Sequence, residues 1–79
     1  MDGLNREDVP KYLQLAALLR NRIEDGSYPR GARLPSEATL IQETGFARDT
    51  VRKAMALLRD EGRIYIVHGL GTFVGPEPD

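Results

Sequence analysis

The sequence predicts a small α+β domain in which three helices precede a β-hairpin. Apolar residues recur at helical spacing in three segments, and a glycine follows each segment. Two β-branched and aromatic runs, Ile64–Val67 and Thr72–Val74, come last, with a glycine-containing loop between them. A chain of 79 residues without cysteine has one compact core and no disulfide framework.

The first helix is predicted to begin at Pro10, because the N–H that proline lacks would be unpaired there in any case. Gly26 ends this helix, and residues 27–31 form a turn. Its apolar stripe consists of Tyr12, Leu15, Ala16, Leu19 and Ile23, widened by Leu18. Residues 32–34 then form a short strand that stops at Pro35, since proline is tolerated only at the margin of a sheet.

Ser36 is a strong N-cap for a second helix over residues 37–44, which Gly45 terminates. The third helix is predicted over residues 48–61, with Gly62 as its stop. At 100° per residue, its apolar positions share one face. They are Val51, Ala54, Met55 and Leu58.

Polar and charged residues occupy the rest of the third helix. Arg48, Arg52 and Arg59 lie within 40° of one another on the helical wheel, and Asp49 and Lys53 extend this open face. Only three residues, 45–47, join the second and third helices, as in a helix-turn-helix. With the hairpin behind it, the predicted fold is a winged helix-turn-helix, whose second motif helix enters the DNA major groove.

The charges are unevenly distributed along the chain. The overall net charge is −1, but residues 9–75 carry ten Lys and Arg against seven Asp and Glu. The acidic excess lies in the two tails. Nine of the eleven basic residues are arginines, which suit phosphates and guanine edges. We expect a flexible acidic N-terminus over residues 1–9, the domain over 10–75, and a disordered tail or linker start over 76–79.

These motifs together resemble the N-terminal DNA-binding domain of GntR-type bacterial transcriptional regulators. The resemblance extends over residues 10–74, in the order and spacing of that family. The matching residues are Tyr12, Leu15, Ala16, Leu19–Ile23, Gly26–Pro29, Leu34–Glu37, Arg48–Ala54, Glu61, Gly62, Gly69 and Gly71–Val74.

The resemblance implies that Arg48 and Arg52 contact DNA, that Thr50 contacts a phosphate, and that His68 and Gly69 reach the adjacent minor groove. Helix 48–61 would then occupy the major groove and the wing, residues 68–71, the minor groove. Arginine can bridge O6 and N7 of guanine, and glycine lets the backbone approach the duplex. The full set of candidate DNA-binding residues is Ser36, Glu37, Arg48, Asp49, Thr50, Arg52, Lys53, His68 and Gly69.

Two positions depart from the family pattern. Ala38 stands where the family usually has an arginine that touches DNA. Ala47 stands where it usually has Ser or Thr before the recognition helix, and losing such a cap costs about 1 kcal/mol. Asp49 in the first turn offsets part of this cost through the helix dipole.

The expected function is therefore a sequence-specific DNA-binding transcriptional regulator, most often a repressor, bound as one half of a homodimer to a pseudo-palindromic operator. Its partner is double-stranded DNA in the bacterial cytoplasm. No cofactor, metal or membrane is expected, and an effector ligand only with a further C-terminal domain. A winged helix that docks a protein through its third helix is the alternative. An enzyme built on Ser36, Glu37 and His68 has little support, because no oxyanion loop is visible.

Overall fold

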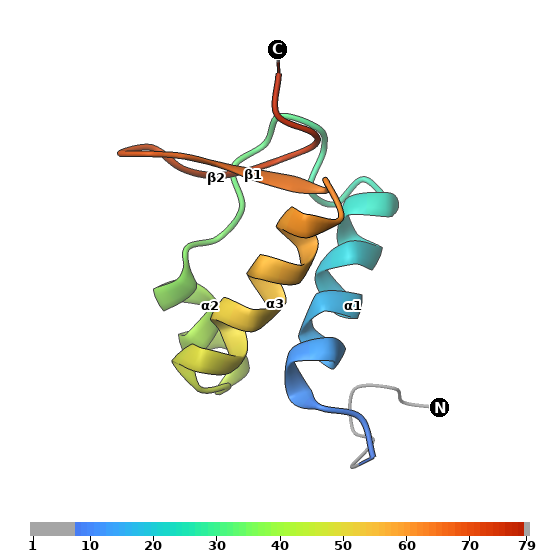
Figure 1. Cartoon of the computed structure of the whole chain (residues 1–79), viewed down its shortest axis with the longest axis vertical. Coiled ribbons are helices and arrows are strands. Elements are labelled where there is room, and N and C mark those ends of the chain that lie inside the picture. The colour runs from blue at the N-terminus through green and yellow to red at the C-terminus, as the bar shows by residue number, and fades with distance from the viewer. Residues whose placement is uncertain (1–7, 79) are drawn as a thin grey trace.

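The computed structural model describes residues 8–78 and has the predicted element order, three helices followed by an antiparallel hairpin (Figure 1). The elements are α1 (Lys11–Glu24), α2 (Glu37–Thr44), α3 (Arg48–Asp60), β1 (Ile64–Val67) and β2 (Gly71–Val74). This arrangement is the α+β winged helix-turn-helix fold. The flexibility expected for residues 1–7, and the disorder expected at residue 79, lie outside the described residues.

The helix ends follow the local signals in the sequence. Helix α1 begins one residue later than predicted, because Pro10 is its N-cap, and Gly26, with φ +87°, follows its C-terminal end. The last helix is one residue shorter than expected, because Glu61 is the C-terminal cap of α3 rather than its final residue. The Glu61 N–H still closes the last turn by donating to the Leu57 carbonyl at 3.0 Å.

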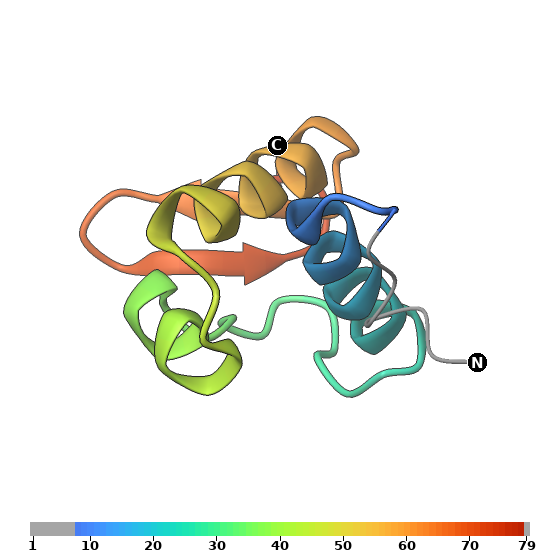
Figure 2. The same cartoon turned by 90° about the horizontal axis from the view of Figure 1, so that it is seen from below.

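One hydrophobic core lies among the three helices and the wing. The face of α3 that the helical wheel places inward is buried, with Val51, Ala54 and Leu58 fully inaccessible and Met55 nearly so. Figure 2 shows α1 and α3 side by side, with the hairpin alongside them. The other buried hydrophobic residues are Leu15, Ala16, Leu19, Leu34, Leu40, Ile64 and Val74.

The second strand of the wing begins one residue earlier than predicted. Gly71 was expected in a four-residue loop, but it pairs with Val67 and is the first residue of β2. The loop is therefore residues 68–70. Gly71 adopts φ +132°, and a Cβ there would lie 2.7 Å from Nε of Arg33, so any other residue would strain the backbone and displace the Arg33 side chain.

The short strand expected at residues 32–34 is a single β-bridge, from Arg33 to Phe73. Two flanking hydrogen bonds extend this contact. The Leu34 N–H donates to the Thr72 carbonyl at 2.8 Å, and the Val74 N–H donates to the Ala32 carbonyl at 2.9 Å. Strand β2 thus lies between β1 and the segment that leads into α2, which ties the wing to the start of the helix-turn-helix.

An ion-pair cluster fastens α1 to the turn between α3 and β1. Nε and Nη2 of Arg20 donate to the two oxygens of the Glu61 carboxylate, at 3.0 and 2.7 Å. Arg63 also donates to Glu61 at 3.1 Å and pairs with Glu24 at 2.9 Å. The hydrogen bond from Arg20 lowers the pKa of the Glu61 carboxyl and raises the pKa of Arg20.

This lowered pKa predicts how folding stability depends on pH. A carboxylate whose pKa is lower in the folded chain contributes stability above the ordinary glutamate pKa, and that contribution is lost as pH falls through the folded value. The Glu61→Gln variant should melt below the wild type at pH 7, and the gap should shrink below about pH 4. Melting followed by circular dichroism tests this, with Glu43→Gln on the exposed face of α2 as control. A gap equal at pH 7 and pH 3 would contradict the assignment.

Candidate nucleic-acid interface

The helix-turn-helix is fixed at its turn by local hydrogen bonds. Ser36 Oγ accepts a hydrogen bond from the Thr39 N–H at 3.1 Å, so Ser36 is the N-cap of α2, as predicted. Gly45 ends α2 in the left-handed conformation, with φ +76°, and its N–H donates to the Ile41 carbonyl at 2.8 Å. An L-residue rarely adopts that conformation, so glycine sets the angle at which α3 leaves the turn.

Helix α3 lacks the corresponding side-chain cap. Ala47 occupies the N-cap position with no side-chain hydrogen bond, and Asp49 is the acidic residue of the first turn. Both features agree with the sequence analysis. The start of the recognition helix is therefore less well stabilised than the start of α2.

The two caps predict opposite stability changes. Ser36→Ala should lower the free energy of unfolding by about 1 kcal/mol, since the Thr39 N–H loses its acceptor. Ala47→Ser should raise the free energy of unfolding by about as much, because its hydroxyl can accept an orphan N–H of the first turn. Urea titration of each variant measures these changes. A stabilising Ser36→Ala or a clearly destabilising Ala47→Ser would contradict the cap assignments.

The open face of α3 carries the predicted charges in solvent. Arg48, Asp49, Arg52 and Lys53 are exposed, and Thr50 is half-buried. The Lys53 ammonium lies 3.4 Å from the Asp49 carboxylate, one turn earlier. Within residues 8–78, Arg48 makes no ion pair, so its guanidinium is available to a ligand.

Arg52 connects the two helices of the motif. Its Nε lies 3.7 Å from the carboxylate of Glu37, the first residue of α2, and the Arg52 side chain is 65% exposed. A pair this long and exposed is weak, so an incoming anion or base can displace it at little cost. Glu37 therefore orients the Arg52 guanidinium near the start of α2 without burying it.

The wing tip lies on the same side of the molecule as α2 and the N-terminal end of α3 in both views (Figures 1 and 2). His68 and Gly69 are exposed at this tip, and Gly69 adopts φ +81°. Leu70 beside them is 60% exposed. The backbone thus brings α2, the N-terminal end of α3 and the wing tip to one side of the domain. Lys53 instead points toward α1, where its Nζ lies 6.0 Å from the centroid of the Tyr12 ring.

The hydrolytic grouping considered from the sequence is not assembled. Ser36 Oγ is engaged in the cap with Thr39, and Glu37 pairs with Arg52. In the part of the chain that the structure describes, no hydrogen bond connects Ser36, Glu37 or His68 to one another. Across residues 8–78, no group of three or more His, Cys, Asp and Glu side chains is placed to hold a metal ion. Among the same residues, no helix has the length and apolar character needed to cross a bilayer.

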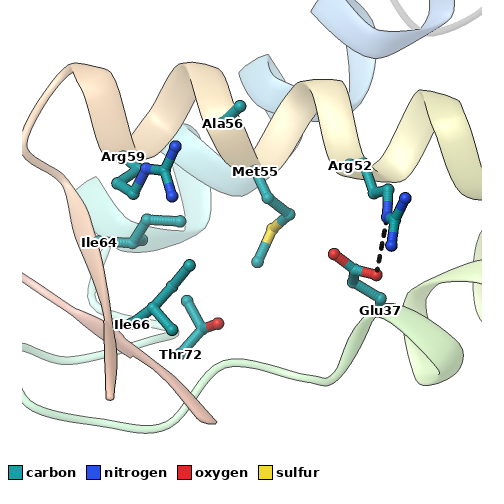
Figure 3. Close-up of a pocket in the computed structure, with 8 residues that line it drawn as sticks. All are labelled: Glu37, Arg52, Met55, Ala56, Arg59, Ile64, Ile66 and Thr72. Atoms are coloured by element: carbon teal, nitrogen blue, oxygen red, sulfur yellow. Dashed lines mark ion pairs between the residues drawn. The ribbon is translucent and has the colours of Figure 1, made fainter. Parts of the chain in front are cut away.

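A groove of about 230 Å³ lies between α3, the wing and the start of α2 (Figure 3). Its lining is Glu37, Arg52, Met55, Ala56, Arg59, Ile64, Ile66 and Thr72. The sequence places Arg59 on the same stripe as Arg52, and Ile66 and Thr72 in the two predicted strands, but none of the three was predicted to belong to a site. The sequence does not give the pairing register of β1 with β2. Ile66 and Thr72 are cross-strand partners that face α3 only in the observed register.

The chain matches the sequence pattern of a family described as "Bacterial regulatory proteins, gntR family" over residues 11–74. Among curated proteins, it is 45% identical over 71 residues to the HTH-type transcriptional regulator Rv0792c of Mycobacterium tuberculosis, covering 90% of this chain and 26% of that protein. It is 37% identical over 66 residues to the histidine utilization repressor of Pseudomonas putida, covering 84% of this chain and 27% of that protein. The chain thus spans about a quarter of the length of these relatives.

Solved structures agree with the sequence match. The DNA-binding domain of AraR, in complex with operator ORR3, superposes with a TM-score of 0.82 at 37% identity, covering 85% of this chain and 81% of that chain. A GntR family transcriptional regulator from Listeria monocytogenes superposes with a TM-score of 0.85 at 26% identity, covering 91% of this chain and 63% of that chain. By sequence pattern, relatives and fold, the chain belongs to the GntR family of bacterial regulatory proteins.

Proposed function

We propose that this chain binds double-stranded DNA sequence-specifically and is the DNA-binding part of a transcriptional regulator. The observation that carries the proposal is the placement of the N-terminal end of α3 and the wing tip on one side of the domain. This placement lets a recognition helix in a major groove and a wing in the adjacent minor groove contact one duplex together. The similar AraR domain was solved with operator DNA, which supports the same use of the fold here.

Each candidate residue has a role in this mode of binding. Arg48 and Arg52 read base edges, since a guanidinium is bidentate to O6 and N7 of guanine. Thr50, Lys53 and the first turn of α2 at Ser36 contact phosphates, which fix the register but carry no sequence information. Glu37 and Asp49 hold their basic partners in place before DNA arrives. His68 and Gly69 enter the minor groove.

We propose that the regulator represses transcription by occupying a pseudo-palindromic operator as a homodimer. Relatives that bear the name histidine utilization repressor support repression rather than activation. Two domains related by a two-fold axis would reach half-sites about 34 Å apart, one helical turn of DNA. The proposal includes no enzymatic activity and no cofactor, and it places the protein with the bacterial nucleoid in the cytoplasm. An effector ligand would act only through a further domain.

His68 gives the wing a testable pH response. The negative potential of the minor groove attracts a positively charged imidazolium more strongly than a neutral imidazole. DNA affinity should therefore rise as pH falls from about 8 to about 6. The His68→Gln variant keeps a hydrogen-bonding group and should lose this slope. Fluorescence anisotropy at each pH measures it, and identical slopes for the two proteins would remove His68 from the groove.

Selection of bound duplexes from a random pool tests the proposed function. We expect enrichment of one consensus with two inverted half-sites, and binding that weakens as salt increases. An Arg48→Ala, Arg52→Ala double variant is the matched control and should enrich no consensus. A wild-type protein that enriches no sequence and binds no duplex would overturn the proposal. It would favour the alternative, a winged helix that docks a protein through α3.

A further inference from the structure

The groove between α3 and the wing has a basic end that the DNA-reading face does not use. Arg52 and Arg59 both line this groove. They are seven residues apart, which is two helical turns or about 10 Å along α3. Arg52 is paired with Glu37 at one end. Among residues 8–78, exposed Arg59 makes no ion pair at the other end, and Figure 3 shows its side chain beside Ile64.

The floor between the two arginines is largely apolar. Met55 and Ile64 are buried beneath it, and Ile66 of the wing remains 47% exposed in the groove. Thr72, opposite Ile66 on β2, adds one hydroxyl. Such a lining suits a chain that alternates apolar sugar carbons with anionic groups, and the sugar–phosphate strand of DNA is such a chain.

The binding geometry places such a strand at this groove. Adjacent major and minor grooves of a duplex are separated by one sugar–phosphate strand. If α3 occupies the major groove and the wing tip the minor groove, that strand must pass between α3 and the wing. The groove lining contains a single carboxylate, Glu37, and it lies at the Arg52 end, two helical turns from Arg59. The Arg59 end is the favourable position for a phosphate.

We propose that Arg59 holds a phosphate of the DNA strand that crosses between α3 and the wing, with Ile66 packed against the neighbouring deoxyribose. This inference rests on the proposed function, because it needs α3 and the wing tip in adjacent grooves. It adds a phosphate-binding site outside the base-reading residues. Arg59 lies two turns beyond Arg52 and fixes how deeply the wing seats, rather than which bases are read.

The test compares three single variants on the selected operator and on a random duplex of equal length, by anisotropy across a salt series. Each contact between a basic side chain and a phosphate releases counterions from the DNA, and this release favours binding more strongly at lower salt. Arg59→Ala loses one such contact, so it should weaken binding to both duplexes about eightfold at 0.1 M salt. It should also reduce the slope of log K against log salt by about 0.9. Arg59→Lys keeps the charge and should keep the slope. Arg30→Ala removes an exposed arginine outside the groove lining and should change neither quantity.

Each other outcome has a distinct meaning. If Arg59→Ala behaves like Arg30→Ala on both duplexes, Arg59 holds no phosphate and the inference is wrong, while the proposed function stands. A loss confined to the operator would also overturn the inference, since it would make Arg59 a base reader. If the wild-type protein binds neither duplex, the proposed function fails, and this inference fails with it.

Discussion

Replacing Leu58 with alanine is expected to cost about 2–5 kcal/mol of the free energy of unfolding. The Leu58 side chain is fully inaccessible, on the face of α3 that packs into the single core of the domain. The change removes buried methyl groups and leaves a cavity that neighbours on α1 and the wing cannot fill without moving. The free energy of unfolding of a small domain is about 5–15 kcal/mol in total, so the variant should be largely unfolded at a moderately raised temperature.

Urea unfolding followed by circular dichroism measures this effect. Leu70→Ala at the wing tip is the matched control, because it makes the same chemical change where the side chain is 60% exposed. Leu70→Ala should leave the unfolding midpoint nearly unchanged. If the two variants unfolded at the same urea concentration, the core centred on α3 would be wrongly placed.

The Arg52→Ala variant should lose affinity for the operator by about 1–3 kcal/mol, roughly five- to 150-fold, and much less for random DNA. Arg52 is exposed on the second turn of α3, and its weak pair with Glu37 leaves it free to turn toward a base. A bidentate contact with guanine is lost when the guanidinium is removed, whereas non-specific binding depends on phosphates elsewhere.

Arg52→Lys separates charge from geometry at the same position. Lysine keeps the positive charge but lacks the planar fork, so it should keep the salt dependence and still lose operator preference. Both proteins are compared with the wild type by competition between operator and random duplexes. Equal losses on the two duplexes would make Arg52 a phosphate contact and move base reading to Arg48.

Local signals in the sequence were sufficient to predict the helices and the exposed face of α3. Ser36 and Gly45 mark the ends of α2 through hydrogen bonds within a few residues, so the residue types at these two positions identify the ends. The inward and outward faces of α3 follow from helical periodicity, as the burial of Val51 and the exposure of Arg52 confirm.

Features that depend on tertiary contacts were not predictable in this way. The Arg20–Glu61 pair joins residues 41 positions apart, and no local pattern connects them. Gly71 was placed in the loop because glycine favours turns, whereas its pairing with Val67 and the close approach of Arg33 put it in β2. The groove beside Arg59 depends on the strand register, which turns Ile66 and Thr72 toward α3.

The central claim is that α3 and the wing tip contact DNA together, and amide chemical-shift mapping tests it most directly. A 79-residue protein suits titration with the selected operator duplex. The account predicts the largest shifts at residues 36–37, 48–53 and 68–69, and only small shifts at the end of α1 and the turn over residues 24–31. Shifts concentrated on α1 and that turn, with the open face of α3 and the wing tip unchanged, would contradict it.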